Sequence, residues 1–76
     1  MNDKRRVNLK EAMGHLGSAA NIVMTVSIEE QMAHDALPDS FQFGEAGDKM
    51  EDAISNLEEV SSLIDEATRL IGDVIK

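Results

Sequence analysis

The sequence has no cysteine, no tryptophan and no tyrosine, and it has one proline and two phenylalanines among 76 residues. The absence of cysteine excludes disulfide bonds and thiolate metal sites. With so few aromatic side chains, Leu, Ile, Val, Met and Ala must fill the core, and these residues suit helices that pack on helices. The composition therefore favours an all-α fold.

Residues 12–28 contain no Asp, Glu, Lys or Arg. A chain of this length buries only about 60% of the surface that it exposes when unfolded, so it cannot shield such a stretch alone. We therefore expect the protein to associate with copies of itself. Gly14, His15 and Asn21 make the stretch too polar for a signal peptide or for a membrane span, which needs about 20 mostly apolar residues. A cytoplasmic location is expected.

The sequence carries 15 acidic and 7 basic residues, for a net charge of −8. Lys4, Arg5 and Arg6 form a basic start, whereas acids dominate from residue 45 onward. Because an acidic surface repels phosphate, we expect no direct contact with nucleic acid or with a membrane.

Residues 45–75 predict one long helix, because apolar residues recur three and four positions apart, as in helices packed at a low angle. Ile54, Ile75, Leu63 and Leu70 widen this apolar face beyond what a two-stranded coiled coil needs, and the width favours a bundle. The repeating positions are Met50, Ala53, Leu57, Val60, Ile64, Ala67, Ile71 and Val74.

Residues 5–36 predict a second helix with the same spacing, at Leu9, Ala12, Leu16, Ala19, Val23, Val26 and Ala33. A second apolar face lies on its opposite side, and two apolar faces require two sets of neighbours. The predicted oligomer contacts are Leu9, Leu16, Val23, Met24, Val26, Ile28, Met32, Leu57, Ile64 and Ile71. Residues 21–28, NIVMTVSI, also alternate as a strand would. Helix is favoured because the flanking heptads continue in phase, although periodicity alone does not separate the two.

Residues 37–44 predict the connecting loop. Pro38 disfavours a helical conformation at Leu37, and Gly44 allows a turn before the second helix. Two helices of similar length with a short connection form an antiparallel hairpin. Two hairpins would make a dimeric four-helix bundle. Phe41 and Phe43 are expected to cover the closed end of the core or, alternatively, to contact a partner.

The run EEQMAHDALPDSFQFGEAGDKMEDAISNL at residues 29–57, with KRR at residues 4–6, resembles small acidic helical proteins of bacteriophages and other bacterial mobile elements. In that group a segment like E-E-Q-x-A-x-x-x-L-P-x-S-[LF]-Q precedes a helix like G-x-K-M-E-x-A-I-x-N-L-E. The resemblance implies a hairpin fold, a mobile-element origin and a location in the bacterial host cell, but no activity. The uncharged residues 12–28 depart from the group, where a more charged helix is expected.

No catalytic constellation stands out. Glu30 and His34 are four residues apart on one helix face, as metal ligands can be, but a bundle metal site needs further carboxylates at matched heights. The sequence shows no nucleophilic side chain together with a general base. It also has no glycine-rich loop before a helix that could hold phosphate. We expect no metal, no cofactor and no enzyme activity.

Two functions are compatible with these observations. The first is a homo-oligomeric interaction module that binds a host or phage protein. The second is an inhibitor that mimics nucleic acid, in which acids of the second helix take the place of phosphates in a host defence enzyme. The candidate partner contacts are Phe41, Phe43, Glu58, Glu59, Asp65 and Glu66.

Overall fold

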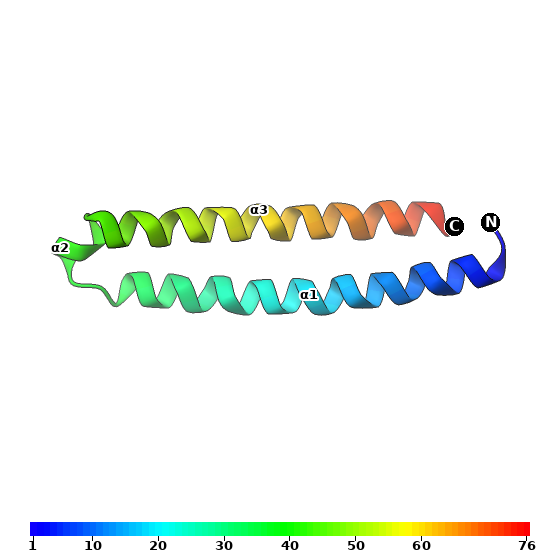
Figure 1. Ribbon diagram of the computed structural model, residues 1–76, viewed down its shortest axis with the longest axis horizontal. Helices are drawn as coiled ribbons and strands as arrows, with labels where there is room; N and C mark the ends of the chain where they lie inside the picture. Colours follow the sequence, from blue (N-terminus) through cyan, green and yellow to red (C-terminus); the bar gives the residue numbers. More distant parts are fainter.

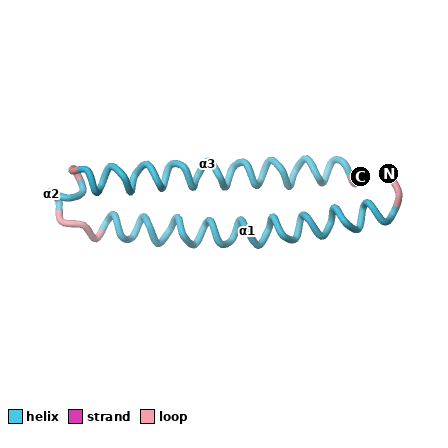
Figure 2. The backbone as a smooth tube through the Cα atoms, viewed as in Figure 1, coloured by secondary structure: helices cyan, strands magenta, loops and turns pink.

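The structure is a computed structural model that describes all 76 residues as a hairpin of two long helices (Figure 1). Helix α1 spans Asp3–Asp35, the short helix α2 spans Asp39–Gln42, and α3 spans Glu45–Val74. The chain contains no strand (Figure 2), so the all-α prediction is confirmed. Residues 21–28 lie inside α1, which settles the choice between helix and strand in favour of helix.

Local signals fix the helix ends. The Asn2 side chain caps α1 by accepting a hydrogen bond from the Arg5 amide at 2.9 Å. Such a cap satisfies one of the amides that have no partner within a helix. α1 ends just before Leu37 and Pro38, as the proline predicts. Glu45 and Asp48 lie in the first turn of α3, where a negative charge is favourable.

Residues 37–44 do not form the simple loop that was expected, because α2 lies within them. Pro38 is the residue before this four-residue helix, and its fixed φ of −56° suits a helix entry. Asp39 lies in the first turn of α2. The connection is therefore a structured corner.

α1 and α3 lie side by side in antiparallel directions, so both termini are at the same end of the molecule (Figure 1). The hairpin is a rod of 58 × 14 × 12 Å with a radius of gyration of 17.3 Å. A compact domain of this length would have a radius of gyration of about 11 Å. The hairpin therefore has no room for an enclosed core.

Only two residues are buried, Gly47 and Ile54, and Ile54 retains 9% of its exposed area. Both lie in the part of α3 that is close to the loop. All other apolar contacts between α1 and α3 involve side chains that stay half-exposed to solvent. The contact between the helices, which we call the seam, is thus a single layer of side chains.

One of the two predicted rows of apolar residues lies in the seam. The seam contains this row and a second one, and residues of the two rows alternate along each helix. Every residue of both rows is buried or half-buried. The first row comprises Leu9, Leu16, Val23, Glu30 and Leu37 of the chain up to the loop and Met50, Leu57, Ile64 and Ile71 of α3.

The second predicted row of α1 borders the seam, with Ala12 and Ala19 half-buried and Val26 and Ala33 exposed. Each helix is rotated so that the row on the other side of the first one makes the closer contact. The rotation brings bulky Ile54 into the contact, and polar side chains come with it. The second row of the seam comprises Met13, Ala20, Ser27 and His34 of α1 and Gly47, Ile54, Ser61, Thr68 and Ile75 of the chain from α3 onward.

Phe41 and Phe43 do not cover the closed end of the core, contrary to expectation. They retain 56% and 85% of their exposed area. The side chain of Gln42, which lies between them in α2, turns back toward α1 in their place. The corner is therefore closed by a polar side chain, and both aromatic rings face solvent.

Candidate functional site

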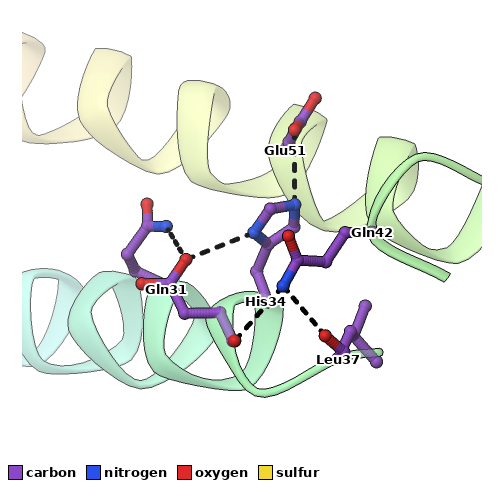
Figure 3. A network of polar contacts seen from close by, with 6 residues as sticks. Gln31, His34, Leu37, Gln42 and Glu51 are labelled. Carbon is purple, nitrogen blue, oxygen red and sulfur yellow. Dashed lines mark hydrogen bonds and ion pairs between the residues drawn. The ribbon is translucent and has the colours of Figure 1, made fainter. Parts of the chain in front are cut away.

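Polar side chains from all three helices meet at the corner of the hairpin (Figure 3). Gln42 Nε2 donates to the carbonyl oxygens of Leu37 at 2.8 Å and Asp35 at 3.2 Å. Asp35 is the last residue of α1 and Leu37 follows it, and the carbonyl at such a helix end has no backbone donor within the helix. The amide of Gln42 therefore ties α2 to the end of α1.

His34 connects α1 to α3 in the same cluster. Its side chain is only 12% exposed, with Nδ1 3.4 Å from Asp35 Oδ1 and Nε2 3.3 Å from Glu51 Oε1. Although Glu51 Oε1 is this close, Nε2 has no hydrogen-bond partner. Asp35 also accepts from Gln31 Nε2 at 3.0 Å. The geometry of the cluster fastens the two long helices together.

The pair considered as metal ligands does not form. Glu30 is half-buried in the seam and has neither a hydrogen bond nor an ion pair, and the partners of His34 are Asp35 and Glu51. The structure contains no group of three or more His, Cys, Asp or Glu side chains placed to hold a metal ion.

The predicted oligomer contacts fall into two sets. Six of them are half-buried in the seam of a single hairpin, namely Leu9, Leu16, Val23, Leu57, Ile64 and Ile71. Met24, Val26, Ile28 and Met32 are exposed. Met24, Ile28 and Met32 are four residues apart and share one exposed stripe of α1, which is the second apolar face that the sequence predicts. Val26 points to a different side, so the four side chains do not form one patch.

The molecule exposes more surface than its mass requires. The accessible surface is 5567 Å². A folded monomer of 8.3 kDa would expose about 4,600 Å² by the usual scaling of area with mass. The excess is about 1,000 Å², which is close to the ~800 Å² that each partner buries in a standard interface.

Much of the exposed apolar surface lies on one side of the seam. The row of Ala19 in α1 and the row of Val60 in α3 both point to this side of the seam. They do so because α3 runs antiparallel to α1, which reverses the direction in which successive rows follow one another around the helix. We call this side the alanine–valine face. It comprises Ala12, Ala19, Val26 and Ala33 of α1 and Ala53, Val60, Ala67 and Val74 of α3.

The next row outward extends the alanine–valine face with Ile22, Leu63 and Leu70, which are all exposed. An open hollow at its α1 edge is lined by Asn21, Ile22, Thr25 and Val26. Ile22 was absent from the predicted contacts, because it lies on neither apolar row of α1. Its only signal in the sequence was a large aliphatic side chain within an uncharged stretch.

Most acids lie away from the alanine–valine face, and the exception is Glu29, which follows Ile22 in the outer row of α1. Glu51, Glu58 and Asp65 of α3 lie on the opposite side of the seam, together with Met24 of α1. A row on the outer surface of α3 is entirely acidic and comprises Glu45, Asp52, Glu59, Glu66 and Asp73. Among the predicted partner contacts, Glu66 is paired with Arg69 at 2.7 Å.

No family model, curated protein or solved structure matches the chain. None of its helices has a stretch long and apolar enough to cross a membrane. The candidate site is therefore defined by its surfaces alone: the alanine–valine face, the acidic side and the two phenylalanines at the corner.

Proposed function

We propose that the protein is a non-enzymatic protein–protein interaction module that works as a homo-oligomer. One observation carries this proposal: the hairpin leaves about 1,000 Å² more surface exposed than a monomer of its mass does. Much of that surface is apolar, and a side chain of Leu or Ile gains about 1.5 to 3 kcal/mol when it is fully buried. Self-association supplies the burial that the single hairpin lacks.

Sedimentation equilibrium across the micromolar range tests self-association. We expect a species heavier than 8.3 kDa. A single species of 8.3 kDa throughout that range would contradict the proposal.

We further propose that the oligomer binds a protein of a bacteriophage or of its bacterial host, which is what the resemblance of residues 29–57 implies. Phe41 and Phe43 support this, because two exposed aromatic rings at a structured corner are suited to insert into a partner. Affinity capture from a bacterial lysate should recover a protein that the double variant Phe41→Ser/Phe43→Ser does not retain. Equal recovery with both proteins would remove the corner from the partner site.

A second candidate function is mimicry of nucleic acid. It is favoured by the acidic row on the outer surface of α3, where five successive positions of one row are Asp or Glu. Such a row could occupy the basic site of a host defence enzyme. Replacing Glu58, Glu59, Asp65 and Glu66 by Lys should then abolish capture of the enzyme. If capture were unchanged, mimicry would be ruled out and the corner would be the remaining partner site.

A further inference from the structure

We propose that the alanine–valine face is the contact between two copies of the hairpin, and that the pair forms a four-helix bundle. This inference rests on the proposed self-association and adds which surface the second copy covers. Four observations carry it: the direction of the apolar stripes, the area, the position of the charges and the size of the side chains.

The first observation concerns direction. In α1, which has apolar side chains on more than one side, the midline of the predicted heptad stripe lies between the row of Leu16 and the row of Ala19, whereas the seam is centred between the rows of Leu16 and Ala20. The two centres differ by about half of 100°, or roughly 50° around the helix. In a square bundle of four helices, the centre lies about 45° from the line that joins neighbouring helices.

The stripe of α3 is rotated in the same way, between the rows of Leu57 and Val60, while its seam lies between the rows of Leu57 and Ser61. Both stripes turn toward the alanine–valine face, because the two helices run in opposite directions. They therefore converge on a line above that face. A second hairpin on the face would place this line at the centre of a four-helix bundle.

The second observation is the area. A stable interface of standard size buries about 800 Å² on each partner. The excess surface of the hairpin is about 1,000 Å² by comparison with a compact monomer. Contact with one further copy on one face is therefore enough to reduce the exposed area of each chain to that of a compact monomer of the same mass.

The third observation is charge. Each chain has a net charge of −8, so two copies repel each other unless they approach through surfaces without acids. The side that carries Glu51, Glu58 and Asp65 would bring like charges together. The alanine–valine face has no acid between Ala12 and Val26 of α1 or between Ala53 and Val74 of α3 on its two rows. Charge therefore selects this face for a second copy of the same chain.

The fourth observation is side-chain size. The antiparallel register, in which His34 meets Glu51, brings Ala19 to the height of Ala67 and Val26 to the height of Val60. Small side chains at the middle of a face allow two helix pairs to approach closely. Leu63 and Leu70 on the outer row then fill the space beside them. The half-buried Leu16, Val23 and Ile64 become fully buried in the same step.

The experiment compares two matched double variants by sedimentation equilibrium. Leu63→Glu/Leu70→Glu changes two side chains on the proposed contact, which are 61% and 49% exposed in the hairpin. Met24→Glu/Ile28→Glu makes the same chemical change on the opposite side, at side chains that are both 54% exposed. We expect twice 8.3 kDa for the wild type and for Met24→Glu/Ile28→Glu, and 8.3 kDa for Leu63→Glu/Leu70→Glu.

The outcomes separate this inference from the proposed function. A wild-type dimer that survives Leu63→Glu/Leu70→Glu would overturn the alanine–valine face as the contact and leave self-association intact. A wild-type assembly other than a dimer would overturn the four-helix bundle. A monomeric wild type would overturn both proposals, and the exposed face would then belong to a different protein.

A second measurement covers the case in which the glutamate variants lose their helices. The chain has no cysteine, so one introduced thiol can be followed by its rate of maleimide labelling. Val60→Cys should react about tenfold more slowly in the dimer than after dilution to the monomer, because access controls thiol reactivity. Met24→Cys should react at the same rate at both concentrations. Equal rates for Val60→Cys at both concentrations would overturn the inference.

Discussion

The loop end and the open half of the hairpin are held together in different ways. At the loop end, Gly47 and Ile54 are buried, and the contact between His34 and Glu51 joins α1 to α3. In the open half no residue is buried, and every ion pair joins residues three or four positions apart along the chain, as Arg69 does with Glu66 and Asp73. A single hairpin therefore packs well at the loop end, whereas the seam of the open half stays partly exposed to solvent.

The comparison shows where a second copy would contribute most. Residues 12–28, which carry no formal charge, lie in the open half opposite the later turns of α3. Their half-exposed side chains gain little from the single seam. Because burial scales with the area removed from water, the open half gains more from an additional layer than the corner does.

The largest expected effect is at Ile54. Ile54→Ala should lower the free energy of unfolding by about 3 kcal/mol, because it removes the only buried large side chain. Ile71→Ala in the half-buried open part makes the same change and should cost less than half as much for the single hairpin. Urea unfolding followed by circular dichroism, at one low protein concentration, gives both values. Equal losses would show that the two ends are equally well packed.

The next effect is at Gly47, where α2 passes directly over α3. A Cβ atom at this position would lie 2.6 Å from the carbonyl carbon of Gln42, so the backbone must move. Gly47→Ala should therefore cost about 2 kcal/mol, although alanine favours a helix. Gly14→Ala is the matched control, because nothing lies within 4 Å of its Cβ position. It should stabilise the helix by about 0.5 to 1 kcal/mol.

A third effect distinguishes the donor role of Gln42. Gln42→Glu replaces an amide donor by a carboxylate that faces the carbonyls of Leu37 and Asp35, and it should cost about 1 to 2 kcal/mol. Gln31→Glu makes the same change at an exposed site four residues from Asp35 and should cost a few tenths of a kcal/mol. The difference between the two midpoints in urea is the measurement. A similar shift for both variants would mean that the corner does not depend on this amide.

The smallest effect has the opposite sign. Glu30 is half-buried in the seam without a partner, and the antiparallel register places it at the height of Ile54. Glu30→Leu should raise the free energy of unfolding by about 1 kcal/mol, because it removes an unpaired carboxylate and buries an apolar side chain. A loss of stability on this substitution would show that the carboxylate has a stabilising role within the hairpin.

Some residues lie where the sequence predicts them, and others do not. The row of Leu9, Leu16 and Val23 was predicted to be apolar contact, and it lies in the seam. The role of Gln42 could not be predicted, because it depends on the direction in which α2 leaves Pro38. The exposure of Phe41 and Phe43 follows from the same turn and was likewise decided by geometry beyond the local sequence.

The sequence by itself determined the two long helices, the corner at Pro38 and the apolar stripe along each helix. These features depend on local propensity and on the period of one helix, which the order of residues contains directly. The tertiary structure decided which neighbouring row joins Leu16 and Leu57 in the seam. That choice depends on how each helix is rotated about its own axis, and only the packing partner determines the rotation. An apolar stripe that is wide enough to contact two neighbouring helices has the same sequence pattern whichever of these helices belongs to the same chain.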